Sequence, residues 1–234
     1  MKKMISRILQ RATLKDQQNK QFTKVLDLAT LNLGNSCVIF DVGAYHGSFT
    51  DEFQRISPAS QFHLFEPNLK AFEKLEKKFS QRQGIVLNHV AISNKTEKSV
   101  LYLNTFDETN SLLPSNSVDP LIDPLTRNIG LQDVNVIRLD NYIHTKNIKL
   151  IDFVKIDTQG NSYNVLDGLG SLLSSQKVKF LYLEAEFIQI YKNEKCFSEI
   201  EIFMRQNGYR LKDIFNVNYT KDGMLAWCDA LFCL

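Results

Sequence analysis

Short apolar runs recur along this chain, and each is followed by a loop or by an amphipathic stretch. The first run covers residues 37–42, and comparable runs cover residues 62–66, 85–92, 151–157 and 178–187. A strand that is apolar at successive positions is buried on both faces of its sheet, as in parallel sheets covered by helices. This pattern confines the chain to the α/β class.

Helical periodicity occupies the intervals between the apolar runs. It predicts helices over residues 48–56, 69–80, 161–174 and 197–207, the last of which is closed by Gly208. Strands that alternate with helices pair in parallel through right-handed crossovers. We therefore expect a doubly wound, mostly parallel sheet of the Rossmann-like kind.

Further strands extend this pattern. Residues 98–103 alternate as an extra strand does, and residues 134–143 indicate a short strand followed by a turn of helix. Residues 209–217 and 225–234 predict two strands joined by a turn at residues 221–223, and so short a link requires antiparallel pairing. The expected sheet has seven strands, with an antiparallel strand at the C-terminus.

The 234 residues are expected to form one domain with a small N-terminal extension. Residues 1–33 show helical spacing and a basic first half, and residues 34–234 make up the expected domain. A basic helix suits a membrane surface or a partner, or it caps the domain with a solvated charged face. The absence of Trp and Phe from residues 1–15 favours the capping helix.

Charge and cysteine usage exclude several classes of protein. The net charge of +2, from 28 basic and 26 acidic residues, is too balanced for nucleic-acid binding through bulk charge. The four cysteines show neither a CxxC motif nor Cys/His ligand spacing, so we expect reduced thiols and no metal site. The sequence shows neither a signal peptide nor an apolar stretch of about 18 residues that would span a membrane. We expect a cytoplasmic protein, with no sequence signal for its oligomeric state.

The loop at residues 41–47 follows the first apolar run and precedes a helix. Gly43 and Gly47 allow the backbone to approach a ligand closely, and the helix N-terminus supplies free N–H groups. A dinucleotide site has a further glycine in the middle, where this chain has Tyr45. Asp41 also disfavours a pyrophosphate, whereas it suits a cation such as the ammonium group of a methionine moiety.

Glu66 stands 19 residues beyond Gly47, at the end of the next predicted strand. A carboxylate there accepts hydrogen bonds from both ribose hydroxyls. Together with Asp41 and the two glycines, Glu66 describes a site for a nucleoside that carries an amino acid, which means S-adenosyl-L-methionine. The alternative is an ordinary tight turn followed by a surface glutamate.

Charged residues also stand at the ends of the two later apolar runs. Asp157 is expected to face the methionine end of the cofactor or the substrate, or else to cap the helix that begins near Asn161. Glu184 and Glu186 point to the same side of their strand, either with one of them as a general base or both as solvated charges. For the proton acceptor or its support, we expect Asp157, then Lys155, then Glu184.

Residues 104–130 are rich in Asn, Ser, Asp and Pro, and we expect them to be the least structured part of the domain. A loop this long inside a compact domain is usually functional or mobile. We expect this loop and the N-terminal helices to select the substrate.

An ordered series of segments resembles the FkbM-type S-adenosylmethionine-dependent methyltransferases. The segments are VIFDVGAYHGSF, LFEP, RLDNYI, IDFVKIDTQGNSYNVLDG and FLYLEAEF, in this order from Val38 to Phe187. Many members of that family have Glu before the glycine of a Lys-x-Asp-x-x-Gly segment, where this chain has Gln159. Carried over by position, the resemblance implies cofactor contacts at Asp41, Gly43, Ala44, Gly47, Glu66, Asn68, Ala91 and Asp157.

The resemblance further implies methyl transfer to a hydroxyl group of a small-molecule or glycan acceptor, such as a sugar or a secondary metabolite. Two other classes remain as alternatives. One is a protein that binds S-adenosylmethionine or a partner without turnover. The other is a nicotinamide-dependent oxidoreductase, which the missing middle glycine disfavours.

Overall fold

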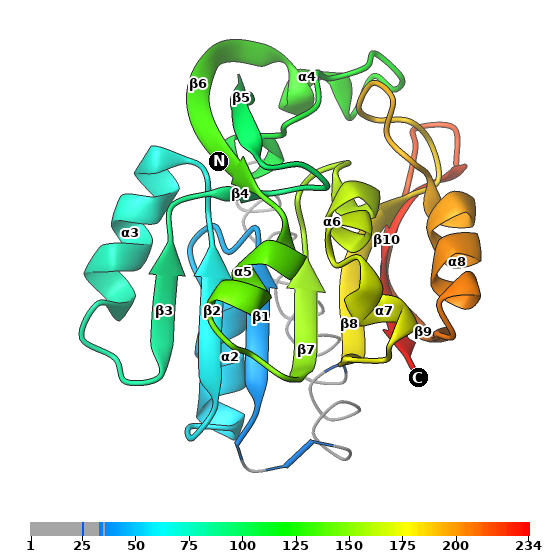
Figure 1. The fold of residues 1–234 in the computed structure, drawn as a ribbon. Helices are drawn as coiled ribbons and strands as arrows, with labels where there is room; N and C mark the ends of the chain where they lie inside the picture. Colours follow the sequence, from blue (N-terminus) through cyan, green and yellow to red (C-terminus); the bar gives the residue numbers. More distant parts are fainter. Residues whose placement is uncertain (1–24, 26–32, 35) are drawn as a thin grey trace, which may run out of the picture. The chain divides into compact units, whose positions relative to one another are not determined.

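A seven-stranded sheet forms the centre of the computed structural model, which describes residues 25, 33, 34 and 36–234 (Figure 1). The chain divides into two compact units, residues 1–34 and 35–234, and the elements below belong to the second unit. The helices expected over residues 1–33 lie almost entirely outside the described residues.

The strand order of the central sheet is β3-β2-β1-β7-β8-β10-β9. The first five of these pair in parallel, whereas β10 is antiparallel to both β8 and β9. This arrangement confirms the predicted fold class, including the antiparallel C-terminal strand. The strands are β1 (Val38–Val42), β2 (Gln61–Phe65), β3 (Ile85–Asn88), β7 (Ile151–Ile156), β8 (Val178–Glu186), β9 (Arg210–Tyr219) and β10 (Leu225–Cys233).

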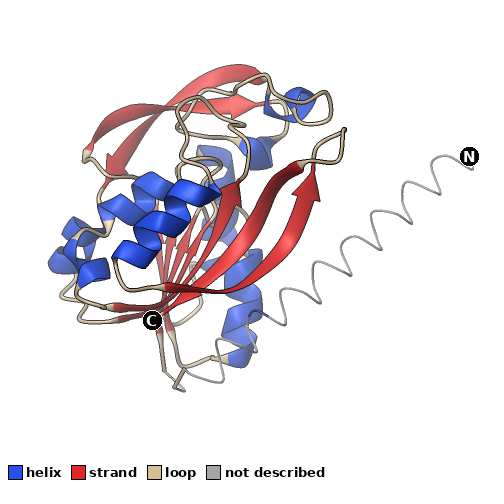
Figure 2. Ribbon diagram, turned by 90° about the vertical axis from the view of Figure 1, so that its right-hand side faces the viewer, coloured by secondary structure: helices blue, strands red, loops and turns tan. Residues whose placement is uncertain are grey.

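Helices cover both faces of this sheet, as Figures 1 and 2 show. On one face, Phe49 of α2 (Ser48–Ile56) stacks on Phe153 of β7 and Phe53 of α2 meets the same ring edge-on, while α3 (Leu69–Phe79) lies beside α2. The other face packs its apolar side chains against four helices. These are α5 (Leu139–Thr145), α6 (Ser162–Gly168), α7 (Ser171–Ser174) and α8 (Phe197–Gln206).

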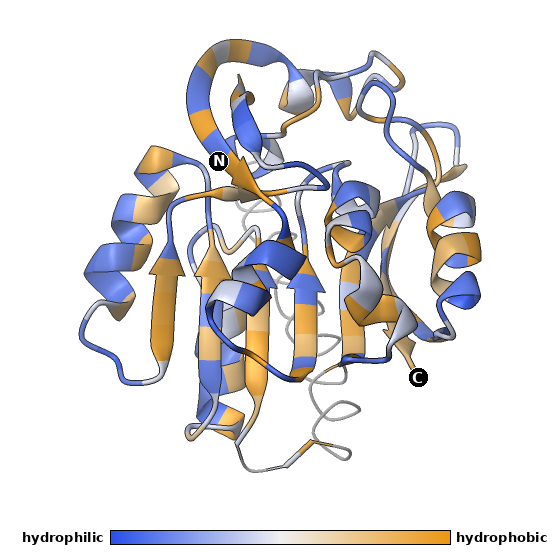
Figure 3. Ribbon diagram, viewed as in Figure 1, coloured by the Kyte–Doolittle hydropathy of each residue, from blue (hydrophilic) through white to orange (hydrophobic). Residues whose placement is uncertain are grey.

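A second, three-stranded sheet crosses above the carboxyl ends of the parallel strands (Figure 1). Its order is β4-β6-β5, formed by β4 (Ala91–Ile92), β6 (Asn128–Ile137) and β5 (Glu97–Asn104). In Figure 3 β6 alternates between hydrophobic and hydrophilic residues, whereas the parallel strands are largely hydrophobic. Val134 and Val136 are buried, while Ile129 and Leu131 are more than half exposed. The small sheet therefore has one covered and one open face.

Two predicted elements are wrong because the chain breaks within them. The single strand over residues 85–92 divides into β3 and β4, since the chain leaves the central sheet after Asn88 and joins the small one at Ala91. The single helix over residues 161–174 divides into α6 and α7 at Gly170, whose φ of +54° is outside the helical region. A continuous apolar pattern does not show a change of sheet or of helix axis.

The region over residues 104–130 is more ordered than its composition predicts. It contains a 3-10 helix, η1 (Asp107–Thr109), the short helix α4 (Asp123–Thr126) and the first residues of β6. Ser111 also forms an isolated β-bridge with Tyr102 of β5. Turns stabilised by local hydrogen bonds, such as those from the backbone of residues 118 and 119 to Asp123, carry no periodic pattern in the sequence.

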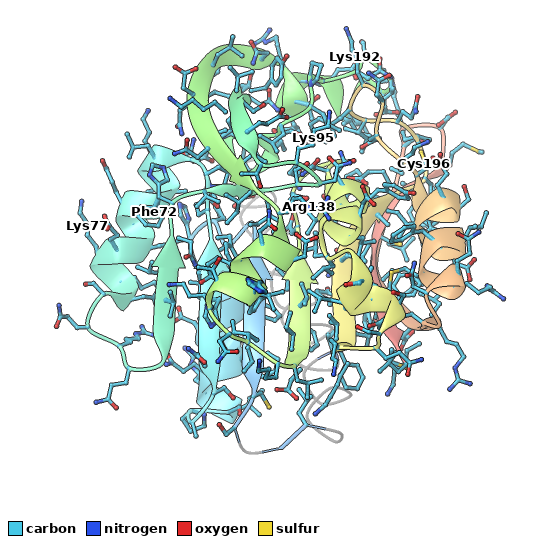
Figure 4. The ribbon with its side chains drawn as sticks, in the orientation of Figure 1. Phe72, Lys77, Lys95, Arg138, Lys192 and Cys196 are labelled. Atoms are coloured by element: carbon cyan, nitrogen blue, oxygen red, sulfur yellow. The ribbon has the colours of Figure 1, made fainter. Side chains whose placement is uncertain are left out.

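The RLDNYI segment connects the small sheet to the helical layer. Arg138, labelled in Figure 4, stands where β6 runs into α5. Its guanidinium donates to the backbone oxygen of Asn94 at 2.6 Å and to both carboxylate oxygens of Asp140. These bonds tie the junction of β6 and α5 to the turn that follows β4.

The four cysteines are free thiols, as expected from their spacing. Cys37 and Cys228 are buried, and Cys196 and Cys233 are partly buried. Within the described part of the chain, no helix has the length and apolar character needed to cross a membrane.

Candidate active site

The glycine loop between β1 and α2 is held by contacts within the protein. Gly43 and Gly47 have φ values of +75° and +70°, which favour glycine. A Cβ on Gly43 would lie 1.8 Å from the backbone oxygen of Asp157, and one on Gly47 would lie 2.2 Å from the Phe79 ring. The loop passes so close to the end of β7 and to α3 that it requires glycine at both positions, whether or not a ligand is bound.

A buried ion pair connects the ends of β1 and β7. The strand register places Asp41 directly beside Lys155, and the Lys155 ammonium lies 3.3 Å from Asp41 Oδ1. The same ammonium donates to the Gly43 backbone oxygen at 2.6 Å and lies 3.6 Å from Asp157 Oδ2. Burial disfavours its charge, but the carboxylates of Asp41 and Asp157 outweigh this effect and raise the pKa of Lys155.

Asp41 itself is fully buried, and Oδ2 accepts a hydrogen bond from the Thr50 hydroxyl of α2 at 2.8 Å. Its carboxylate thus faces Lys155 and α2 rather than the open edge of the sheet. Any contribution of Asp41 to a ligand in this conformation passes through Lys155 and the glycine loop.

Glu66 follows β2 and faces the same loop. Its Oε2 accepts from the backbone N–H of Tyr45 at 2.7 Å, and its Oε1 accepts from that of Asn68 at 2.8 Å. The side chain is 6% exposed, and burial raises the pKa of Glu66 to about 7. The predicted alternative of a surface glutamate is therefore wrong.

Three further residues that were predicted to contact the cofactor make local contacts within the protein. Ala44 is buried, and its N–H donates to the Phe65 backbone oxygen at 3.0 Å. Asn68 caps α3 by accepting from the Ala71 N–H at 3.0 Å. Ala91 begins β4, pairs with Val136 of β6 and packs in the small apolar core of the second sheet.

The loop after β7 brings Asp157 and Glu184 together. Gln159 Nε2 donates to Asp157 Oδ1 at 3.1 Å and to Glu184 Oε1 at 2.7 Å. Asp157 retains 43% side-chain exposure, and the helix α6 has Asn161 rather than Asp157 at its N-cap. The alternative in which Asp157 is only a helix cap is therefore wrong.

Additional carboxyl groups surround this pair. Glu186 is 1% exposed and accepts from the Gly160 N–H, so it is not a solvated surface charge. Burial, then the charges of Asp157 and Glu186, raise the pKa of Glu184 well above its ordinary value. Asp229 of β10 stands opposite Glu184 in the strand register and accepts from the Tyr182 hydroxyl at 2.7 Å. Burial raises its pKa to about 6.

The segment from β5 to the β-bridge of Ser111 is tied to this edge of the sheet. The Tyr45 hydroxyl donates to Asp107 Oδ1 at 2.8 Å, and the Tyr191 hydroxyl shares its single proton between the Thr109 backbone oxygen at 3.0 Å and Gln159 Oε1 at 2.9 Å. Ser111 Oγ donates to the Gln159 backbone oxygen at 2.5 Å. Side chains from both halves of the domain therefore meet above the carboxyl ends of β1, β7 and β8.

The predicted residues mostly meet here, but several partners were not predicted. Asp41, Gly43, Glu66, Lys155, Asp157 and Glu184 all lie at this edge, whereas Ala91 lies in the small sheet. Thr50, Asp107, Tyr191 and Asp229 were missed, because no sequence spacing relates them to the motifs. Only the strand assignment of residues 225–234 offered a signal, since it places Asp229 near the edge where β8 ends.

Comparison with known proteins supports a functional assignment. The sequence model described as the Methyltransferase FkbM domain matches residues 41–211. The chain belongs to the FkbM methyltransferase family. This confirms the resemblance drawn from the sequence, and it confirms S-adenosylmethionine as the cofactor of this FkbM methyltransferase.

Individual relatives are distant. The 2-O-methyltransferase NoeI of Sinorhizobium fredii (strain NBRC 101917 / NGR234) is 25% identical over 163 residues, which are 67% of this chain and 66% of NoeI. Among solved structures, the methyltransferase domain of bacterial CtHen1-C has a TM-score of 0.50 at 11% identity, covering 94% of this chain and 98% of that one. TrmK of M. capricolum, solved with S-adenosylhomocysteine, has a TM-score of 0.47 at 12% identity, covering 89% and 66%.

Ligand-dependent unfolding tests the cofactor. Saturation at about 100 times the dissociation constant adds roughly 2.7 kcal/mol to the free energy of unfolding. For a chain of this length, that raises the melting temperature by roughly 5–11 °C. We expect this shift with S-adenosylmethionine and with S-adenosylhomocysteine, and none with NAD. A shift with NAD alone would contradict the assignment.

Replacement of Gly43 tests whether the loop is built against β7. Gly43→Ala is expected to destabilise the protein by at least about 2 kcal/mol more than Gly223→Ala, measured by urea unfolding. Both positions have positive φ and share the conformational cost, but nothing lies within 4 Å of a Cβ at Gly223. Equal losses in the two variants would show that the contact with Asp157 does not matter.

Proposed function

We propose that the protein transfers the methyl group of S-adenosylmethionine to a hydroxyl oxygen of a small polyhydroxyl acceptor, such as a sugar or a secondary metabolite. The observation that carries this proposal is the pair of carboxyl groups, Asp157 and Glu184, joined by one amide at the open edge of the sheet. An oxygen acceptor must lose a proton, and these groups can accept it. The relative NoeI, a 2-O-methyltransferase, agrees with an oxygen acceptor.

The residues at the carboxyl ends of β1 and β2 fit the adenosine and methionine parts of the cofactor. Glu66 accepts one backbone N–H on each carboxylate oxygen, which leaves further lone pairs for the two ribose hydroxyls. We propose that Glu66 binds the ribose and that the glycine loop of Gly43, Ala44 and Gly47 lies against the methionine part. Asp41, Asn68, Ala91 and Asp157 complete the proposed contacts, Asp41 by holding Lys155 and the loop.

Bound S-adenosylmethionine supplies an electrophilic methyl group, so the protein needs no nucleophile of its own. The task of the chain is to align the acceptor oxygen and to receive its proton. Alignment in intramolecular models is worth up to roughly 7–11 kcal/mol of the barrier, and a positioned base about 10²–10⁴-fold in rate.

Each of the three proposed catalytic residues has a distinct part. Asp157 is the most exposed of them and is placed to accept the proton at its carboxylate. Lys155 stays charged beside Asp41 and Asp157, and therefore orients carboxylates rather than acting as a base. Glu184, whose pKa is raised, accepts from the same Gln159 amide and supports Asp157 rather than relaying its proton, because an N–H donor between two carboxyl groups does not carry a proton from one to the other.

A protein that binds S-adenosylmethionine without turnover is the second candidate. Binding needs the Lys155–Asp41 pair and a contact from Asp157, but not the second carboxyl group that Gln159 joins to Asp157. Transfer of labelled methyl to a panel of sugars, other hydroxyl compounds and amines, with the product position determined by NMR, distinguishes the two. O-methyl products support the proposal, and N-methyl products contradict it.

Asp157→Asn is expected to lower kcat by about 10²–10⁴-fold, because it removes the proposed proton acceptor while keeping its size. The dissociation constant for S-adenosylmethionine, measured by calorimetry, should change by less than about threefold, since the amide retains a hydrogen-bonding oxygen. Asp133→Asn, an exposed position on β6, is the matched control and should leave kcat unchanged. Full activity in Asp157→Asn would exclude Asp157 as the base.

Cofactor affinity is expected to depend on the protonation of Glu66. The ionised carboxylate accepts the ribose hydroxyls, so affinity should be highest above the pKa of about 7 and fall as the pH drops below it. The fall approaches about tenfold for each pH unit. Glu66→Gln should bind more weakly and lose this dependence, whereas the amino group of the ligand titrates in both proteins. An identical pH profile in Glu66→Gln would contradict the role of Glu66.

A further inference from the structure

Gln159 lies between the carboxyl groups of Asp157 and Glu184, and both N–H donors of its side chain are used within the protein. Its Nε2 donates to Asp157 and to Glu184, and its Oε1 accepts from the Tyr191 hydroxyl at 2.9 Å. A primary amide has two N–H donors and one carbonyl oxygen, so no donor remains for a ligand. Gln159 is therefore arranged to hold other side chains rather than to bind the acceptor itself.

The backbone of Gln159 is held equally firmly. Its φ of +55° lies in the left-handed region, which a residue other than glycine adopts only under strain. Ser111 Oγ bonds to its backbone oxygen, and the following Gly160 N–H bonds to Glu186. A strained conformation that is fixed from both sides positions the amide between the two carboxyl groups.

We propose that Gln159 is a positioning residue for the methyl transfer, whose amide keeps the carboxyl groups of Asp157 and Glu184 side by side and turned toward the acceptor hydroxyl. The proposal rests on the function proposed above. It also gives a reason for the amide of Gln159, because an acid at residue 159 would stand between the carboxyl groups of Asp157 and Glu184. Like charges at hydrogen-bond distance repel and raise each other's pKa.

The charges around Asp157 and Glu184 make residue 159 sensitive to an added negative charge. Lys155 of β7 is the cation near these acids within the described part of the chain, and it is already shared by Asp41, Gly43 and Asp157. The other titratable groups that face the pair come from several elements. They are Tyr182 and Glu186 of β8, Asp229 of β10, Glu108 of η1, and Tyr191 of the segment before α8.

Two variants of nearly the same size as glutamine test the proposal. Gln159→Glu adds a carboxyl between Asp157 and Glu184, and Gln159→Met removes the amide without adding charge. We expect Gln159→Glu to lower kcat at pH 7 by about 10- to 100-fold, the change expected from losing a hydrogen bond to a charged group. In this variant, the acid limb of the pH profile of kcat should move to higher pH by about one unit or more. Gln159→Met should lower kcat with a smaller shift of the limb.

The controls separate positioning from folding. Gln81→Glu makes the same chemical change at an exposed position and should match the wild-type protein in kcat and pH profile. KM for S-adenosylmethionine should stay within about threefold in all variants, because Gln159 makes its hydrogen bonds to protein groups. Tyr191→Phe removes the bond that orients the amide, and should reproduce part of the kcat loss while leaving the acid limb nearly in place.

A measurement that does not use activity completes the test. In a carbon-13 NMR titration of labelled Asp and Glu carboxyls, the resonances of Asp157 and Glu184 are assigned as those missing from Asp157→Asn and Glu184→Gln. In Gln159→Glu, the assigned resonances should titrate at higher pH than in the wild-type protein. A folded Gln159→Glu protein with wild-type kcat, pH profile and titration overturns the proposal. If the methyl group goes to nitrogen instead of oxygen, the proposed function fails, and the NMR titration still decides the role of Gln159.

Discussion

The ion pair between Lys155 and Asp41 determines how the ends of β1 and β7 meet. One buried ammonium group contacts the Asp41 carboxylate, the Gly43 backbone oxygen and, more distantly, the Asp157 carboxylate. A buried charge is destabilising unless it is paired and hydrogen-bonded, and removing one partner costs more than the pair contributes. The loop after β1 and the loop after β7 are consequently fixed to the same atom. The positions proposed for the methionine part and for the proton acceptor follow from that single contact.

Strand registers extend this pair into a band of polar groups on one face of the sheet. Asp41 pairs with Lys155, Lys155 with Tyr182, and Glu184 with Asp229. The residues between them in sequence point to the opposite face, which is apolar and covered by α5 to α8. The functional groups therefore share the face of α2 without interrupting the larger core. This separation explains how strands that are almost wholly apolar carry several charges at their carboxyl ends.

The sequence was sufficient for the central sheet because buried parallel strands and amphipathic helices leave periodic patterns. It also predicted that Asp41, Gly43, Glu66 and Asp157 lie at one edge of this sheet, since each stands at or just after the end of an apolar run. It was not sufficient for the second sheet, whose strands β4 and β5 read as part of the central pattern. The partners Thr50 and Asp229 were out of reach for a different reason. Their contacts depend on strand register and helix orientation, which no spacing along the chain encodes.

The β5–β6 segment is attached to the site by side chains rather than by shared strands. Tyr45, Tyr191 and Ser111 each contribute one hydrogen bond to this attachment, and the bonds join the segment to the glycine loop, to the segment before α8 and to Gln159. The Tyr45 bond ends on the side chain of Asp107, whereas the other two end on the backbone oxygens of Thr109 and Gln159. The attachment therefore constrains the Asp107 side chain, and the bond to Thr109 depends on its backbone alone. Glu184 belongs to β8 and Asp157 follows β7, whereas this segment lies outside the central sheet. Under the proposed function, recognition of the acceptor by this segment is therefore separable from proton transfer at the carboxyl pair.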